Sequence, residues 1–300
     1  MLLNIGGHGL GDCLLSLQIS QLLTVQGVEH KNLISTRQEI YDVLRYVFGN
    51  KFELYKIDES VSEDNAIENN FQILSDLKYE YNADNVCYNV PDLLFTNPLS
   101  LELNKYNLSP QVIKKTRVLS DEYFEKDKIV YCGLATNTNG YLYHDIGNLL
   151  SSLCDKLSDY TIYFPYVTHW VRDIKYDDNI LKINKPNLWI DENPNFNNSM
   201  DILKKSVYGV FTCNGPSHVA YHMNIPRLIL DPQFHRVVWM SRWKEDYEEC
   251  IDISTDYNSV SELIYSNVTV PQTTMIDRKI ILNMIQSQNK NWHSLFYFKY

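Results

Sequence analysis

The sequence has few basic residues relative to its acidic ones. Its 300 residues contain 27 Lys and Arg against 37 Asp and Glu, a formal net charge of −10. A protein that binds nucleic acid needs a basic surface, because it must neutralise phosphates and release their counterions. The charge balance therefore argues against a nucleic-acid partner. An anionic ligand would have to be held locally, by helix ends and a few side chains.

The cysteines are not spaced like the ligands of a metal site or the pairs of a redox motif. The six cysteines are scattered, none forms a C-x-x-C pair, and most lie inside apolar runs. A free thiol in such a run behaves as a small hydrophobic group. The pattern argues against a disulfide framework and against a structural zinc site.

Long apolar runs are also missing. No run reaches the roughly 18 residues that a membrane-spanning helix needs. The amino terminus has neither the basic start nor the long apolar stretch of a signal peptide. We expect a cytoplasmic protein without a transmembrane segment. Peripheral contact with a membrane surface stays open.

Strand and helix patterns alternate along the chain in two runs. Period-2 or apolar segments predict strands, and apolar residues at i, i+3 and i+4 predict helices. The first run has predicted strands at 2–5, 32–35, 52–57 and 85–90, and helices at 12–25, 40–47, 70–78 and 109–117. The second has strands at 129–133, 161–164, 208–212 and 227–230, and helices at 146–157, 200–205, 215–223 and 276–289.

A charged gap without periodicity, residues 119–128, separates the two runs. We place the boundary there, with one domain at 1–122 and a second at 123–300. Alternating strands and helices imply parallel β-α units with ligands at the carboxyl ends of the strands. The predicted fold is α/β, with two Rossmann-like domains facing across a cleft.

The first strand-to-helix turn is unusually rich in glycine. Residues 2–23 read LLNIGGHGLGDCLLSLQISQLL, with four glycines within six positions. Glycines after a strand allow close approach of another molecule. The spacing matches neither a dinucleotide fingerprint nor a P-loop, and Asp12 would repel a phosphate. Two interpretations of Asp12 stay open: a helix N-cap, or a general base for a substrate hydroxyl.

The second turn suits an anion. Residues 207–232 read VYGVFTCNGPSHVAYHMNIPRLILDP, in which a strand ends at about Thr212. A capping residue, a small residue and a first-turn proline follow, and then a hydroxyl and an imidazole: Asn214, Gly215, Pro216, Ser217 and His218. The free N–H groups of a helix start favour a pyrophosphate there. The alternative for His218 is a packed histidine bonded to backbone.

Two further features are weaker. His218 and His222 share a helix face at i, i+4 spacing, but no third ligand accompanies them, so we expect no metal site. The loop GLATNTNG, residues 133–140, follows a strand and carries Thr136, Asn137 and Thr138. These side chains could donate hydrogen bonds to a phosphate.

The two turns together resemble one family. GLGDCLLSLQISQLL is similar to the G-x-x-G-D start of the heptosyltransferase-type glycosyltransferases, family nine of the sequence classification. TCNGPSHVAYHMNIPRLILDP is similar to the donor-binding signature of that family, and the spacing of about two hundred residues between the turns also fits. The resemblance covers about a fifth of the chain.

The resemblance implies a GT-B fold, with the acceptor on the amino domain and a nucleotide sugar on the carboxyl domain. The helix at 276–289 would pack back on the amino domain. By position, Asp12 matches the catalytic base, and Gly9, Gly11 and His8 lie in the acceptor-side loop. Donor binding would fall to Thr136, Asn137, Thr138, Asn214, Gly215, Pro216, Ser217 and His218.

The implied reaction is inverting, metal-independent transfer of a sugar to a hydroxyl of a glycan or glycoconjugate, with no cofactor. Cys213 stands where the family has an acidic residue, and the loop near Thr136 lacks the family's Lys. Two alternatives stay open: a non-hydrolysing nucleotide-sugar epimerase on the same fold, and a glycosyltransferase-like binding protein without activity.

Overall fold

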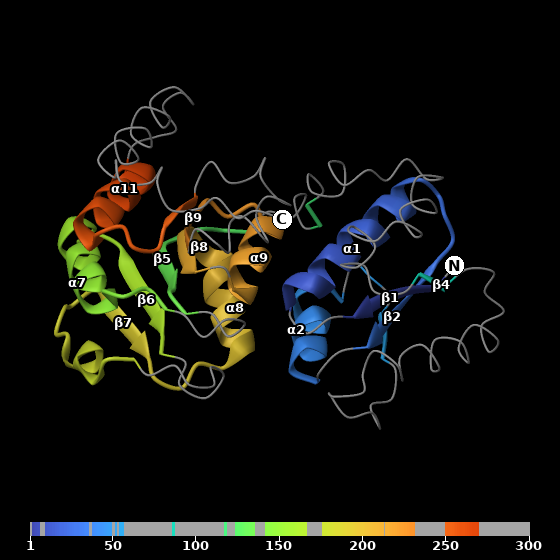
Figure 1. Ribbon diagram of the computed structural model, residues 1–300, viewed down its shortest axis with the longest axis horizontal. Coiled ribbons are helices and arrows are strands. Elements are labelled where there is room, and N and C mark those ends of the chain that lie inside the picture. Colours follow the sequence, from blue (N-terminus) through green and yellow to red (C-terminus); the bar gives the residue numbers. More distant parts are fainter. Residues whose placement is uncertain are drawn as a thin grey trace, which may run out of the picture.

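The computed structural model shows two α/β lobes side by side (Figure 1). It describes residues 2–6, 10–35, 38–49, 52, 54–56, 86–87, 117–118, 124–135, 142–166, 176–212, 214–231 and 250–269. The predicted helices at 70–78 and 276–289 lie outside these residues, as does 109–117 except its last residue. The domain boundary at 122/123 stays a prediction.

The amino lobe is built on a parallel sheet of four described strands in the order β3-β2-β1-β4. The strands are β1 (Leu2–Gly6), β2 (Lys31–Ser35), β3 (Leu54–Lys56) and β4 (Val86–Cys87). In register, Leu2 pairs with Lys31 on one side and with Val86 on the other. The carboxyl ends of β1 and β2 therefore lie at the same edge, where α1 (Leu10–Val25) and α2 (Gln38–Phe48) begin.

Both predicted helix ends in this lobe are confirmed. Gly27 follows α1 with a positive φ of 71°, which glycine adopts without strain. Gly49 follows α2, and its N–H donates to the carbonyl of Arg45 at 3.0 Å. The start of α1 differs from expectation. The helix begins at Leu10, so Asp12 lies in its first turn and is not the N-cap.

The carboxyl lobe has a parallel six-stranded sheet in the order β10-β9-β8-β5-β6-β7. The strands are β5 (Asp127–Gly133), β6 (Thr161–Pro165), β7 (Leu188–Asp191), β8 (Ser206–Thr212), β9 (Arg227–Asp231) and β10 (Cys250–Asp252). The order reverses between β5 and β8, so a crevice forms at the carboxyl ends of these two strands. The switch point thus puts the loop after β5 beside the turn after β8.

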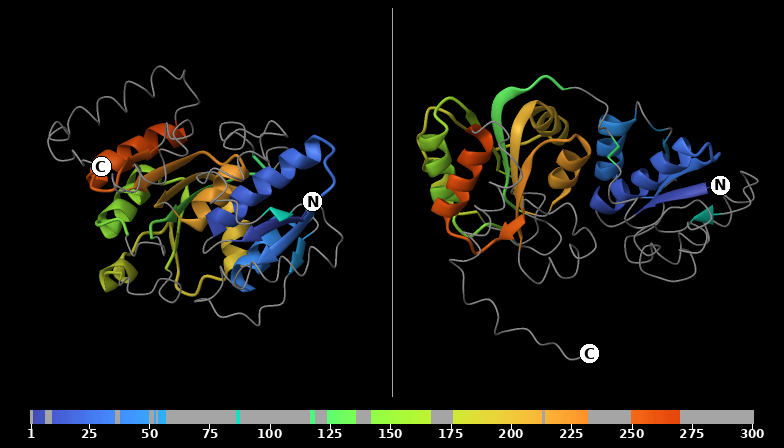
Figure 2. Two further views of the ribbon diagram at one scale, coloured as in Figure 1. Left: turned by 45° about the vertical axis from the view of Figure 1, so that its right-hand side comes forward. Right: turned by 90° about the horizontal axis from the view of Figure 1, so that it is seen from above.

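Helices cover both faces of this sheet (Figures 1 and 2). On the outer face lie α7 (Ile146–Lys156) and α11 (Tyr257–Thr269); on the face toward the amino lobe lie α8 (Phe196–Lys205) and α9 (Gly215–His222). A short 3₁₀ helix, η2 (Asp178–Lys182), precedes β7. The stripe predicted for α7 is confirmed, since Ile146, Leu149, Leu150, Leu153 and Leu157 are all buried.

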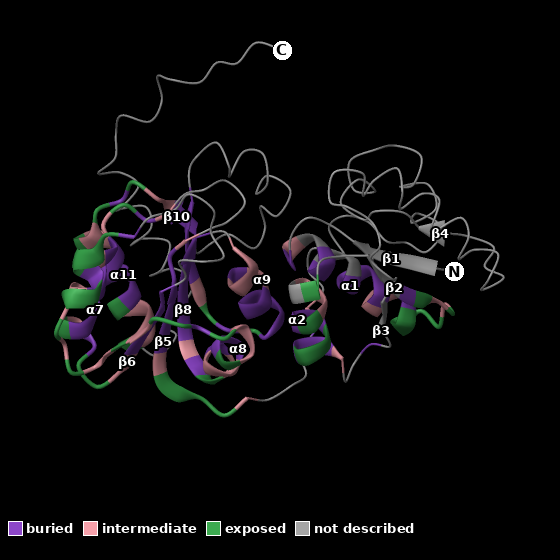
Figure 3. Ribbon diagram, turned by 90° about the horizontal axis from the view of Figure 1, so that it is seen from below, coloured by how far each residue is buried: buried purple, intermediate pink, exposed green. Residues whose placement is uncertain are grey.

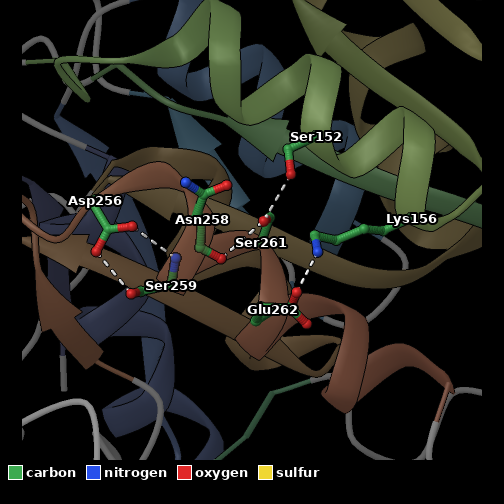
Figure 4. Close-up of polar contacts among 7 residues, drawn as sticks. All are labelled: Ser152, Lys156, Asp256, Asn258, Ser259, Ser261 and Glu262. Atoms are coloured by element: carbon green, nitrogen blue, oxygen red, sulfur yellow. Dashed lines mark hydrogen bonds and ion pairs between the residues drawn. The ribbon is translucent and has the colours of Figure 1, made fainter.

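Four of the described elements were not predicted: η2, β7, β10 and α11. The strands β7 and β10 are short edge strands, and β7 has no alternating sequence pattern because the apolar Trp189, 46% exposed, stands at its exposed position. The sequence of α11 is rich in Asn, Ser and β-branched residues, which are weak helix formers. Packing against α7 holds it instead, through Ser152–Ser261 at 2.9 Å and the Lys156–Glu262 ion pair (Figure 4).

The buried apolar residues that the structure describes form two clusters, and one of them belongs to both lobes. The first lies between α7, α11 and the outer face of the six-stranded sheet. The second joins α1 and α2 of the amino lobe to α8, α9 and the inner face of that sheet (Figure 3). Its members include Leu14, Leu17, Val43, Leu44, Phe48, Tyr131, Met200, Leu203, Phe211, Val219 and Met223. A shared core of this kind holds the lobes together by burial of apolar surface.

Candidate functional site

The starts of α1 and α9 face one another across the two lobes. A Cβ built on Gly11 would lie 2.9 Å from both Cδ2 and Nε2 of His218. A Cβ built on Gly215 would lie 3.1 Å from Cδ2 of Leu10. Real Cβ atoms do not approach other atoms to 2.9 Å, so Gly11 is needed for this contact. The sequence analysis expects the glycines of this turn to allow close approach of another molecule. In the structure, Gly11 allows close approach of the His218 imidazole from the other lobe.

The turn after β8 is closed by a capping box. The Asn214 side chain accepts from the Ser217 N–H at 3.0 Å, and the Asn214 N–H donates to the Ser217 hydroxyl oxygen at 3.2 Å. Pro216 occupies the first turn, as predicted, where a missing N–H costs nothing. Because Asn214 has an extended backbone and Ser217 is buried, the start of α9 is a rigid corner.

The capping box changes what the turn can offer an anion. The Ser217 hydroxyl donates to the Asn214 carbonyl at 2.6 Å, so its proton is committed within the turn. The N–H of Gly215, the helix dipole and the half-buried His218 are at the same corner. The place of Ser217 in a donor site stays a prediction, and its capping role is one that the sequence analysis did not assign.

Asn214 also joins this turn to the loop after β5. Its Nδ2 donates to the carbonyl oxygens of Gly133 at 2.8 Å and Ala135 at 2.9 Å. Ala135 in turn forms an isolated bridge with Leu142, which closes the base of the intervening loop. The segment that continues into Thr136 therefore starts beside α9, as the adjacent positions of β5 and β8 require.

Several predicted site residues lie outside the described part of the chain. These are His8, Gly9, Thr136, Asn137 and Thr138, together with Cys213. Asp12 is placed by its backbone in the first turn of α1, one residue after Gly11, but its side chain is not described. The structure thus brings together Gly11, Asn214, Gly215, Pro216, Ser217 and His218.

His222 is the main residue that the sequence analysis undervalued. It is 3% exposed, and its Nδ1 accepts the Val118 N–H at 3.3 Å. Burial lowers the pKa of His222 well below its ordinary value, and the nearby His218, Arg227 and Arg117 lower it further. Its i, i+4 spacing from His218 is the available signal in the sequence, but that spacing indicates only that the two rings share a helix face. Among the described residues, no three His, Cys, Asp or Glu side chains converge on a point suited to a metal ion.

A second polar contact joins the lobes through α2 and α8. The Tyr46 hydroxyl donates to the Asp201 carboxylate at 2.5 Å, and the Lys204 ammonium lies 4.8 Å from the centre of the Tyr46 ring. The hydrogen bond to Asp201, with burial, raises the pKa of Tyr46. Since Tyr46 is 41% exposed, this contact borders the shared core on its solvent side.

Solved structures share this arrangement of two lobes. No family model matches the sequence, and no curated protein matches it either. The chain is similar in structure to E. coli heptosyltransferase WaaC with ADP-2-deoxy-2-fluoro heptose, with a TM-score of 0.55 and 12% identity over 89% of this chain and 100% of that one. The fold is GT-B. The same transferase with ADP matches with a TM-score of 0.53 and 14% identity, over 89% of this chain and 98% of the other.

The GT-B fold also matches a protein of a second reaction class. It is assigned as a UDP-N-acetylglucosamine 2-epimerase, from Listeria monocytogenes, and has a TM-score of 0.53 and 10% identity over 100% of this chain and 99% of that one. No helix among the described residues is long and apolar enough to cross a membrane. The expected architecture of two Rossmann-like lobes is confirmed.

Proposed function

We propose that this protein is a glycosyltransferase that moves a sugar from a nucleoside-diphosphate donor to a hydroxyl group of a glycan or glycoconjugate. The observation that carries the proposal is the contact between His218 and Gly11. It puts the start of α9, the proposed anion site, beside the first turn of α1 on the other lobe, where Asp12 lies. An inverting transferase needs the base and the diphosphate site on opposite sides of one anomeric carbon, so both must face the same small space.

The proposed chemistry balances without a metal. The acceptor oxygen attacks the anomeric carbon from the face opposite the diphosphate, so a C–O bond forms as the C–O bond to the phosphate breaks. The Asp12 carboxylate takes the hydroxyl proton. The bonding electrons leave with the diphosphate, whose growing charge is stabilised by the α9 dipole, the Gly215 N–H and His218. The anomeric configuration is inverted.

The donor is proposed to lie over the crevice between β5 and β8. Its diphosphate would contact the corner at Gly215 and His218, and the predicted contacts Thr136, Asn137 and Thr138 would reach it from the loop that Asn214 anchors. The likeness to the WaaC complexes supports a nucleotide sugar as the ligand class, because those structures contain ADP or an ADP-sugar. The acceptor would approach from the α1 side.

Two other activities would occupy the same site. The match to the structure assigned as an epimerase favours epimerisation as the second candidate, with a TM-score close to that of the transferase. A binding protein without turnover is the third. Incubation with ADP-, UDP-, GDP- and dTDP-sugars, followed by NMR analysis, separates them. We expect slow donor hydrolysis without acceptor and an inverted product with it. Interconversion of the donor alone would identify an epimerase, and tight binding without any product would identify the binding protein.

A further inference from the structure

One buried imidazole touches both lobes and the chain that precedes β5. His222 is the last residue of α9 and is 3% exposed. On the amino lobe, the Phe48 ring of α2 meets it edge-on, with centroids 6.2 Å apart. Its Nδ1 accepts the N–H of Val118, which is itself fully buried, at 3.3 Å. Loss of this ring would leave a buried backbone N–H without an acceptor.

The residue before Val118 binds the same end of α9. The guanidinium of Arg117 lies 4.8 Å from the centre of the Tyr221 ring and donates to the Asn224 side-chain oxygen. Asn224 follows the helix with a positive φ of 57°, a conformation that Asn tolerates better than most residues. Residues 117 and 118 are therefore held at the carboxyl end of α9 by the Arg117 side chain and the Val118 N–H.

The geometry requires His222 to be uncharged. An imidazole nitrogen that accepts a hydrogen bond carries a lone pair, so the proton of the neutral ring is on Nε2. The titratable and charged groups that act on the ring are His218 of α9, Arg227 of β9 and Arg117. The neighbour from α2 is the uncharged Phe48. A proton on Nδ1 would break the bond to Val118 and add a buried positive charge beside these cations.

We propose that His222 is a positioning residue that fastens the carboxyl end of α9 to α2 and to residues 117–118, and so keeps His218, one turn away, against Gly11. The helix has only eight residues and packs as one rod, so a shift at His222 moves its amino-terminal corner too. The proposal rests on the proposed function only in naming that corner as the donor site.

Protonation of His222 breaks its hydrogen bond with the Val118 N–H and so loosens the contact between α9 and residues 117–118. The ring in an opened form has the ordinary pKa of about 6.5, whereas the closed form resists the proton. The ratio of open to closed protein therefore rises about tenfold per pH unit below 6.5, and is independent of pH above it. Hydrogen exchange measures such openings even when they are rare.

Two variants of His222 and one control separate positioning from packing. His222→Asn offers a side-chain oxygen in the place of Nδ1 and cannot be protonated. His222→Phe keeps a ring against Phe48 but has no acceptor for Val118. His144→Asn removes an exposed histidine whose Nδ1 lies 3.1 Å from the Ile253 carbonyl, away from the lobe contact.

The experiment is hydrogen exchange with mass spectrometry on the full chain from pH 8 to pH 5.7, corrected for the intrinsic exchange rate. Peptides covering Arg117–Val118 and the first turn of α1 report the two ends of α9. We expect protection of both peptides in the wild type and in His144→Asn to fall about sevenfold in total between pH 8 and pH 5.7, mostly below pH 6.5. We expect constant protection in His222→Asn and low protection at every pH in His222→Phe.

The proposal is overturned if His222→Asn shows the same acid-dependent opening as the wild type, or if opening at Val118 leaves the first turn of α1 unchanged. If His222→Phe does not fold, the comparison of wild type with His222→Asn still tests whether His222 positions α9. Calorimetry with ADP and UDP is run beside it. Absence of nucleotide binding at every pH would contradict the proposed function and leave the exchange result to decide this inference.

Discussion

The imidazole of His218 lies against the backbone of Gly11, close enough that a methyl group on Gly11 would stand 2.9 Å from two ring atoms. These residues are more than two hundred positions apart in the chain and begin helices on different lobes. The contact explains a glycine inside the first turn of α1, where alanine would favour the helix. It also makes the geometry of the proposed site depend on how the lobes meet.

Substitution of this glycine tests that dependence. In Gly11→Ala the new methyl group displaces the His218 ring from its rotamer, at a cost of about 0.5–1.5 kcal/mol. We expect nucleoside-diphosphate affinity to fall up to about tenfold by calorimetry. The matched control is Gly147→Ala in α7, where the nearest atom to a new Cβ is Ile183 Cδ1 at 4.0 Å. That variant should bind as the wild type does, and equal affinity in both variants would contradict the prediction.

Asp12 is tested by separating binding from turnover. In Asp12→Asn the acceptor proton loses its base, so the rate should fall by about 10²–10⁴ while donor affinity is retained. Calorimetry with the nucleoside diphosphate and a product assay measure the two effects. Asp159→Asn, an exposed carboxylate after α7, serves as the control. Turnover of Asp12→Asn at the wild-type rate would remove Asp12 as the base.

Asn214 both caps α9 and links it to the loop after β5, and two substitutions distinguish these roles. Asn214→Ala removes the cap of α9 and the link to Gly133 and Ala135, and should lower the free energy of unfolding by about 1–2 kcal/mol. Asn214→Asp keeps an oxygen for the Ser217 N–H but replaces the donating Nδ2 and adds a negative charge. We expect greater destabilisation in the aspartate variant, because its second carboxylate oxygen would face the Gly133 and Ala135 carbonyls, and also a greater loss of nucleotide affinity. Chemical denaturation and calorimetry give the two values, and the reverse order would contradict the interpretation.

The cap of α11 predicts an acid-dependent loss of stability. The Asp256 carboxylate accepts from the Ser259 N–H at 3.0 Å and from its hydroxyl at 2.7 Å (Figure 4). These hydrogen bonds from Ser259 lower the pKa of Asp256 in the folded protein. The contribution is therefore complete above the unfolded pKa of about 3.9 and is lost as the pH falls through the lower folded value.

Denaturation of Asp256→Ala beside the wild type measures this contribution. We expect a difference in the free energy of unfolding of about 1 kcal/mol at pH 7, which shrinks as the pH falls below about 3.9. Asp256→Asn keeps a neutral cap and should lack the pH-dependent part. A difference between the alanine variant and the wild type that stays constant over this range would show that the charge of the carboxylate has no role.

Much of the fold could be predicted because its signals are local. The stripe of Ile146, Leu149 and Leu153 predicts α7, and Gly27 and Gly49 end their helices as expected. The unpredicted elements are those that depend on neighbours. The strands β7 and β10 are held by one adjacent strand each, and α11 is held by α7 in spite of weak helix formers.

The sequence by itself determined the chemical character of both strand-to-helix turns: an aspartate and glycines after β1, and Asn214, Pro216 and His218 after β8. These are properties of a few consecutive residues, which capping and backbone sterics control locally. Only the tertiary structure decided that Gly11 receives His218 and that His222 binds Val118 between the lobes. Such contacts join residues far apart in the chain, and burial of apolar surface common to both lobes brings them together.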